Sequence, residues 1–271
     1  MEKPGRATKE DHAGPLAEDT LLFLGTGGAR IMVAKQILAS GGFWLNLGGT
    51  QMLVDPGPGS LVQATRRKLD PSRLDAILLS HKHLDHSGDV NAMIEAMTEG
   101  GFKKRGMLLA PLDALENDPV VLRYLRGFLA EIKVLTEGGK YRVGTVEIET
   151  PLRHRHEAET YGMVFSTTAC TISYIADTRY FDELCTRYRG ELLIINVLRL
   201  DPDDRFDHMS VADVARIVQA LRPKVAILSH FGMTIWRARP WEQAERLSQQ
   251  TGVRVIAARD GMRFDLKQLQ G

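Results

Sequence analysis

Short apolar runs separated by glycine and proline are the main pattern of the first sixty residues. Three of these runs have the length and composition of strands, and they cover residues 21–24, 43–47 and 51–54. The glycine-rich segments between them are typical of turns, so the pattern predicts a meander of paired strands. A helical pattern follows over residues 60–69, with Ser60 placed to cap it.

Strands and helices alternate along the rest of the chain. Further strand-like runs cover residues 76–80, 107–111, 145–150, 161–167, 170–177, 191–197, 225–230, 253–258 and 262–266. Helical patterns cover residues 90–97, 120–129, 211–221 and 241–250, and glycines at 138, 139 and 144 indicate a hairpin. The strands come in two sets, each followed by helices, with no linker between the sets. We therefore expect an α/β fold of two sheets packed face to face under helices, in one domain spanning residues 1–271.

Composition narrows the class of protein. The chain has 271 residues, of which 44% are hydrophobic and 25% charged, as in ordinary globular proteins. The first 18 residues are too polar for a signal peptide and are interpreted as a mobile or loosely docked tail. No run approaches 18 uncharged apolar residues, so we expect no membrane span. Two cysteines are too few for a disulfide framework, which predicts a cytoplasmic location; Cys170, unlike Cys185, lies in a strand-like run and is expected to be buried.

The charge balance bears on the partners. A formal net charge of +1 lacks the electrostatic footprint of non-specific nucleic-acid binders. Basic clusters at residues 66–68, 103–105 and 153–155 leave room for a nucleic-acid partner that the net charge does not indicate. No membrane partner is expected, and a homodimer is an open alternative to a monomer.

The strongest chemical signal is the sequence LLSHKHLDHSG at residues 78–88. It places His81, His83, Asp85 and His86 within six residues, a string that shuffled sequences of this composition would contain roughly once in two thousand. Side chains two apart on an extended segment point the same way, so His81 and His83 can bind one metal together. A turn at residues 87–89 would direct Asp85 and His86 toward a neighbouring position, so one loop could serve two metals.

Later strand ends offer the remaining ligands that a binuclear site needs. Each lies where an apolar strand runs out into a loop, and the candidates are His154, His156, Asp177 and His230. Asp55, ahead of Pro56, has two interpretations. It is either a turn residue or a carboxylate that accepts a hydrogen bond from a metal-binding histidine.

Taken together, these segments resemble the metallo-β-lactamase fold superfamily of hydrolases. The resemblance runs through FLGTGG, LVDPGPG, LLSHKHLDHSGD, HEAETYG, IADT and ILSHFG, at residues 23–28, 53–59, 78–89, 156–162, 175–178 and 227–232. It implies a four-layer αββα sandwich of two mixed sheets flanked by helices, with the site along the top edge of the sheets. His156 lies six residues before Gly162, which looks like the spacing of the phosphodiesterase branch and favours it over His154.

The resemblance also implies a ligand set. His81, His83 and His156 would hold the first metal, Asp85, His86 and His230 the second, and Asp177 would bridge the two metals. We expect two divalent metal ions, with zinc ahead of iron or manganese. A hydroxide held between them would be the nucleophile, and Asp85 would orient it.

His208 is the candidate proton donor. The segment HMS at residues 208–210 resembles a histidine loop of the transfer-RNA 3′-processing branch, where such a residue helps the leaving group. The alternative is a polar loop residue ahead of a helix that Ser210 caps.

The substrate is the least defined part. Arg153, Arg155, Arg179 and Arg199 flank the ligand segments, and guanidinium groups suit phosphate oxygens, which favours a small-molecule or short nucleotide phosphodiester. No Gly-rich basic arm of the transfer-RNA processing branch is evident, so transfer-RNA maturation itself is not expected. The alternatives are hydrolysis of a lactone, thioester or β-lactam carbonyl, and a metal-binding protein without turnover.

Overall fold

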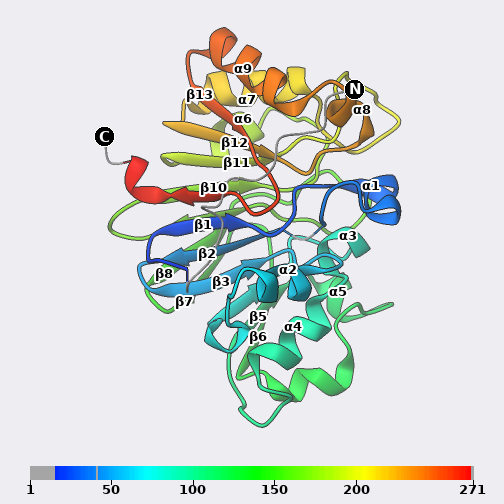
Figure 1. Cartoon of the computed structure of the whole chain (residues 1–271), viewed down its shortest axis with the longest axis vertical. Coiled ribbons are helices and arrows are strands. Elements are labelled where there is room, and N and C mark those ends of the chain that lie inside the picture. Colours follow the sequence, from blue (N-terminus) through cyan, green and yellow to red (C-terminus); the bar gives the residue numbers. More distant parts are fainter. Residues whose placement is uncertain (1–15, 41, 270–271) are drawn as a thin grey trace.

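Two seven-stranded sheets pack face to face, and helices cover the outer face of each sheet (Figure 1). This arrangement is seen in a computed structural model that describes residues 16–40 and 42–269. Both sheets mix parallel and antiparallel pairs. The predicted α/β four-layer sandwich is therefore confirmed.

The first sheet has the strand order β14-β1-β2-β3-β4-β5-β6. Its strands are β1 (Thr20–Phe23), β2 (Phe43–Leu47), β3 (Thr50–Val54), β4 (Ala76–Leu78), β5 (Met107–Ala110), β6 (Glu131–Val134) and β14 (Arg263–Asp265). The second sheet has the order β13-β12-β11-β10-β9-β8-β7. Its strands are β7 (Gly139–Val143), β8 (Val146–Thr150), β9 (Met163–Ser166), β10 (Thr171–Ile175), β11 (Leu192–Asn196), β12 (Val225–Ser229) and β13 (Arg254–Ala257).

Helices form the two outer layers, with α7 and α9 over the second sheet and α2 and α4 over the first (Figure 1). The α-helices are α1 (Ala29–Lys35), α2 (Ser60–Arg66), α3 (Leu84–Ser87), α4 (Val90–Met97), α5 (Leu112–Leu115), α6 (Leu184–Arg187), α7 (Val211–Leu221), α8 (Met233–Arg237) and α9 (Pro240–Thr251). Short 3-10 helices cover Pro71–Arg73, Arg123–Phe128 and Leu266–Leu269.

Alternation along the strands builds three apolar layers. In β2, Phe43, Leu45 and Leu47 belong to the cluster between the sheets, whereas Trp44 belongs to the cluster under α2 and α4. Side chains of a strand point alternately to opposite faces, so a strand buried on both sides is mainly apolar, and Asn46 is the one polar residue of β2. Cys170 is only partly buried, against the cluster between the sheets.

Most predicted elements are confirmed within a few residues. The predicted meander is the antiparallel set β1-β2-β3, and the glycine-rich hairpin is β7-β8. Ser210 caps α7 as expected, because its Oγ accepts a hydrogen bond from the backbone N–H of Asp213 at 3.3 Å.

The prediction that Ser60 caps helix α2 is wrong. Ser60 is the first helical residue of α2, and its Oγ donates to the carbonyl of Gly57 at 2.7 Å. Gly59 precedes the helix with φ 90°, and the carboxylate of Asp89 accepts the backbone N–H of Leu61 at 2.9 Å. The side chain of Asp89, distant in the sequence, therefore accepts a backbone N–H of the first helical turn, which was the role predicted for Ser60. The helix predicted over residues 120–129 is also shorter, since only the 3-10 helix Arg123–Phe128 forms.

Leu16, the first described residue, is held against the first sheet. Residues 1–15 of the predicted tail lie outside the described residues, but Leu16 is buried and its carbonyl accepts a hydrogen bond from Asn46 Nδ2 at 3.0 Å. The prediction of a loose tail therefore does not hold at Leu16.

None of the helices in the described part of the chain is long and apolar enough to span a bilayer.

Candidate metal centre

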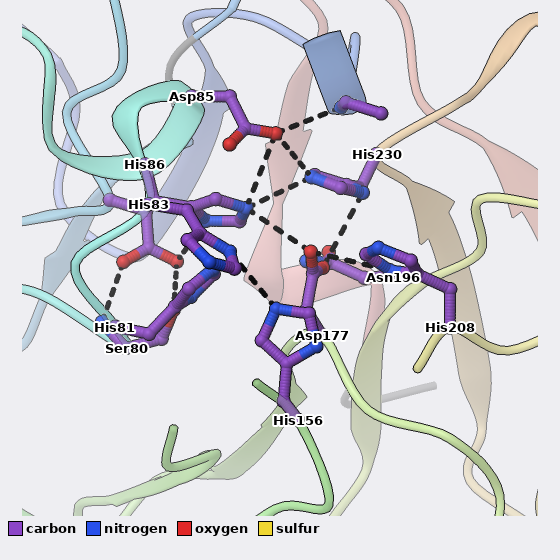
Figure 2. A network of polar contacts seen from close by, with 12 residues as sticks. Ser80, His81, His83, Asp85, His86, His156, Asp177, Asn196, His208 and His230 are labelled. Carbon is purple, nitrogen blue, oxygen red and sulfur yellow. Dashed lines mark hydrogen bonds and ion pairs between the residues drawn. The ribbon is translucent and has the colours of Figure 1, made fainter. Parts of the chain in front are cut away.

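Histidine and carboxylate side chains from both sheets converge at one edge of the sandwich (Figure 2). The loop after β4 and helix α3 supply His81, His83, Asp85 and His86. The loops after β8, β10, β11 and β12 supply His156, Asp177, His208 and His230. Strand ends thus bring together residues that are up to 149 positions apart, counted from His81 to His230.

One group of donors consists of His81, His83 and His156, whose ligand atoms lie within 4.8 Å of one another. His83 Nδ1 and His156 Nε2 face each other at 3.1 Å. Ser80 Oγ donates to Asp55 at 2.7 Å, so it accepts the N–H of His81 Nδ1 at 3.0 Å. That bond leaves Nε2 of His81 as the nitrogen with a free lone pair.

A second group consists of Asp85, His86 and His230. Nε2 of His86 and Nε2 of His230 face each other at 2.9 Å, and the latter lies 3.3 Å from Asp85 Oδ2. Asp177 Oδ2 lies 3.5 Å from His86 Nε2, and Asp177 also groups with His81 and His86. Asp177 is therefore within reach of both groups.

The two candidate third histidines have different environments. His156 donates from Nδ1 to the carbonyl of Asp207 at 3.1 Å and directs Nε2 at His83. His154 donates from Nδ1 to the carbonyl of Asp177 at 3.2 Å, and its Nε2 accepts the hydroxyl of Tyr188 at 2.6 Å. Both nitrogens of His154 are thus occupied inside the fold, whereas His156 points one nitrogen at the cluster.

Burial and charge set the protonation of the cluster. Burial lowers the pKa of His81 well below its ordinary value, which keeps its imidazole neutral and able to bind a metal. Burial also opposes charge on His86, but the carboxylates of Asp177, Asp85 and Asp55 raise its pKa well above the ordinary value. His86 is therefore protonated in the metal-free fold and would release this proton on binding a metal.

Asp55 connects the first sheet to the cluster. Its Oδ1 accepts the backbone N–H of Ser80 at 2.6 Å, and its Oδ2 lies 3.0 Å from Nδ1 of His86 and accepts the hydroxyl of Tyr174 at 2.8 Å. Asp55 also has φ 53°, in the left-handed region, directly ahead of Pro56. Its approach to His86 is the contact that the carboxylate interpretation predicts.

The donor set fits a metal. Nε2 of His81 is buried and has no hydrogen-bond partner among the described residues. A buried polar atom without a partner is destabilising by about 1–3 kcal/mol, and a metal ion would provide the missing contact. Imidazole and carboxylate donors suit zinc, iron and manganese alike.

Comparison with known proteins decides the family. The chain matches the Beta-lactamase superfamily domain over residues 50–231, which is more than half of its length. The chain belongs to the Beta-lactamase superfamily. This superfamily member is 32% identical over 255 residues to an uncharacterized protein of Methanocaldococcus jannaschii, across 91% of this chain and 94% of that protein.

Solved structures agree on the fold of this superfamily member. The metallo-β-lactamase fold protein YhfI of Bacillus subtilis superposes with a TM-score of 0.73 at 20% identity, covering 90% of this chain and 98% of YhfI. The short form of human tRNase Z superposes with a TM-score of 0.70 at 16% identity, covering 91% of this chain and 99% of that structure. These likenesses establish the fold and not the substrate.

The imidazole of His208 lies next to a carboxylate of the metal centre. Its Nδ1 is 3.5 Å from Asp177 Oδ2, and it forms a further group of donors with His156 and Asp177. Burial lowers the pKa of His208 to about 4, so its imidazole is neutral at neutral pH. This geometry allows His208 to bind a metal, a role that the sequence did not predict.

Three of the four arginines that favoured a phosphodiester lie beside carboxylates. Arg179 pairs with Asp207, Arg199 Nη2 lies 2.7 Å from Asp203, and Arg155 Nη2 lies 3.9 Å from Glu183. Arg153, the fourth, is exposed. The expected arginine support for phosphate binding is therefore weaker than the sequence suggested.

Several supporting residues were missed from the sequence. Asn196 Nδ2 donates to Asp177 Oδ1 at 2.8 Å and so orients that carboxylate. Gly28 lies against His230, because a Cβ at Gly28 would come within 2.2 Å of the imidazole. The segment FLGTGG was recognised as part of the family pattern, but nothing in it indicated contact with residue 230.

Proposed function

We propose that this chain is a binuclear metal-dependent hydrolase that acts on a small phosphodiester. The observation that carries the binuclear site is the presence of two separate donor triads, with Asp177 in reach of both. Bound at these donors, two divalent metals would lower the pKa of water toward neutrality and polarise the oxygen of the scissile group.

Asp85 and His208 would have separate roles in the reaction. The backbone N–H of Ala29 donates to Asp85 Oδ2 at 2.8 Å and fixes the carboxylate. Burial opposes ionisation of Asp85, but His86 and His230 lower its pKa below the ordinary value, so it stays ionised and accepts hydrogen bonds. Asp85 is thus suited to orient an attacking water. His208 borders Asp177 and remains partly accessible, so it can contact the leaving group. Because its pKa is about 4, it would have to take up a proton before it could act as the donor.

Support for phosphodiester chemistry comes from the histidine-to-glycine spacing of residues 156–162. Arg155, Arg179 and Arg199 lie beside carboxylates, so among the four arginines only exposed Arg153 supports phosphate binding without such a partner. A small ester with a single reacting centre suits a metal centre with few unpaired cations beside it. The same pairing keeps a lactone, thioester or β-lactam as the second candidate.

An ester panel tests the proposal. We expect zinc-loaded protein to hydrolyse bis-p-nitrophenyl phosphate at least about a hundredfold faster than the His86→Ala variant, because a missing ligand empties one metal position. Higher kcat/KM on a lactone or β-lactam than on the phosphodiester would replace the substrate class. No turnover on any ester would refute the hydrolase.

A further inference from the structure

Tyr174, in β10, is buried in the apolar cluster between the two sheets, yet its hydroxyl has two polar partners. The hydroxyl donates to Asp55 Oδ2 at 2.8 Å and accepts a hydrogen bond from Asn196 Nδ2 at 3.2 Å. Asp55 directly follows β3 of the first sheet, and Asn196 is the last residue of β11 of the second. The hydroxyl of Tyr174 therefore joins the two sheets through a pair of directed hydrogen bonds.

On the side of the first sheet, Asp55 holds one histidine of each donor group. Its Oδ2 lies 3.0 Å from Nδ1 of His86 and accepts the hydroxyl of Ser80 at 2.7 Å. Ser80 Oγ in turn lies 3.0 Å from Nδ1 of His81. His81 belongs to the first donor group and His86 to the second. The position of the Asp55 carboxylate therefore affects the orientation of both imidazoles.

On the side of the second sheet, Asn196 holds Asp177. An amide nitrogen carries two hydrogens, and Nδ2 of Asn196 donates one to the hydroxyl of Tyr174 and the other to Asp177 Oδ1 at 2.8 Å. Asp177, which lies near Asn196 in Figure 2, is within reach of both donor groups. The hydroxyl of Tyr174 therefore connects the bridging carboxylate to the carboxylate that holds the histidines.

Burial and ring packing determine what removal of this hydroxyl would change. Tyr174, Asn196 and Asp55 are all buried, so water is not available to replace a lost hydrogen bond. The ring of Tyr174 packs edge-to-face on Phe43, with the ring centres 5.1 Å apart. This contact does not involve the hydroxyl. A phenylalanine at residue 174 therefore keeps the packing and loses only the hydrogen bonds.

We propose that Tyr174 is a positioning residue whose hydroxyl holds the ligands of both metal positions in the arrangement that binds metal. The proposal rests on the binuclear site of the proposed function. Residues that hydrogen-bond to metal ligands orient those ligands, and their loss weakens metal binding. Because the hydroxyl acts on His81 and His86 through Asp55 and on Asp177 through Asn196, its loss should weaken both metal positions.

Competition with a chromophoric zinc chelator measures the affinity of the metal-free protein for each zinc equivalent. We expect Tyr174→Phe to bind both equivalents about 10–100-fold more weakly than the wild type. Tyr161→Phe is the matched control, because Tyr161 is also buried between the sheets and donates to a carboxylate, Glu159 Oε1, at 2.8 Å. Since that bond holds no metal ligand, the control should stay within about threefold of the wild type.

Asn196→Leu breaks the other end of the link with a side chain of similar shape, so it tests the link without a change at Tyr174. In the double variant with Tyr174→Phe, we expect the loss of affinity to be at least about threefold smaller than the product of the single losses, because both changes break one shared bond. Multiplicative losses, equal losses in Tyr174→Phe and Tyr161→Phe, or a loss at one zinc position alone would each overturn the proposal.

The same titration separates this proposal from the proposed function. A wild type that binds only one equivalent would contradict the binuclear site, and the loss in Tyr174→Phe relative to Tyr161→Phe at that equivalent would still decide whether Tyr174 positions ligands. A wild type that binds no zinc would overturn both. Hydrolysis of bis-p-nitrophenyl phosphate, measured in parallel, tests the reaction independently of the affinities.

Discussion

His154 and His156 lie two residues apart, yet their imidazoles serve different parts of the fold. The sequence favoured His156 as a ligand only through its spacing to Gly162. The structure adds a physical reason, since both nitrogens of His154 have partners and one nitrogen of His156 faces His83. Hydrogen bonds to Tyr188 and to a backbone carbonyl cannot be read from a local pattern.

Elemental analysis of two variants tests this distinction. His156→Ala removes a donor from the first group and should lose one zinc equivalent per chain. His154→Ala removes only the bonds to Asp177 and Tyr188 and should keep its zinc, although with lower stability. Loss of zinc from His154→Ala alone would show that the assignment is reversed.

His154 should also make stability depend on pH. Burial lowers its pKa to about 4 from the ordinary 6.5, so between these values the unfolded chain binds a proton that the folded chain does not. The free energy of unfolding therefore falls as pH drops through this window, by about 2–3 kcal/mol at pH 4.5. Urea unfolding with EDTA present should show this fall in the wild type and a shallower one in His154→Asn. Parallel pH profiles would contradict it.

His208→Ala separates two roles for the side chain. As a proton-exchanging group, His208 can be removed with a loss of turnover of about 10²–10⁴-fold and an unchanged zinc content. As a metal ligand beside His156 and Asp177, it would take zinc with it. Zinc content and kcat, measured on the same sample, decide between these outcomes, and an unchanged kcat would exclude the first role.

At the scale of elements, the strands were predictable and several of their connections were not. Mainly apolar runs next to glycine indicate β1, β2 and β3 from the sequence, because burial on both faces favours apolar composition. Helix α1 was missed because its start lacks the polar residue that indicated α2, a helix of the same length: Gly28 and Ala29 begin α1, whereas Ser60 begins α2. Its placement depends on contacts with distant residues.

The loop between β1 and α1 depends on one such distant residue. The carboxylate of Asp260 accepts the backbone N–H and hydroxyl of Thr26, at 2.9 and 2.7 Å, and the backbone N–H of Ala39 at 2.7 Å. This anchor holds the segment that reaches Asp85 and His230.

Asp260→Ala should destabilise the fold by about 2–4 kcal/mol, because it leaves three donors without their acceptor. Asp265→Ala is the control, since Asp265 accepts the exposed backbone N–H of Lys267, and it should lose less than about 1 kcal/mol. Urea unfolding measures both variants. Equal losses in the two variants would show that the anchor is unimportant.

At the scale of the molecule, the two-sheet architecture was predictable, but the return of the last strand, β14, to the first sheet was not. Two sets of strands with helices after each indicate two packed sheets. The last strand nevertheless pairs with β1 in the first sheet, and nothing in its local sequence specifies that partner. The ion pairs of Arg155 and Arg179 were likewise not predictable, because their carboxylate partners lie in other loops.

The metal centre joins the two halves of the sandwich. His81 to His86 come from the first sheet, and His156, Asp177 and His230 come from the second. Bound metals would therefore link the halves. They would also stabilise the folded state in proportion to their affinity for it.

Titration of the metal-free protein with zinc tests the binuclear hydrolase most directly. Bound zinc and hydrolysis of bis-p-nitrophenyl phosphate are followed in the same samples. We predict that zinc uptake ends at two equivalents per chain and that the rate reaches its plateau only with the second equivalent. Uptake that stops at one equivalent, or two bound equivalents without hydrolysis, would contradict the proposed function.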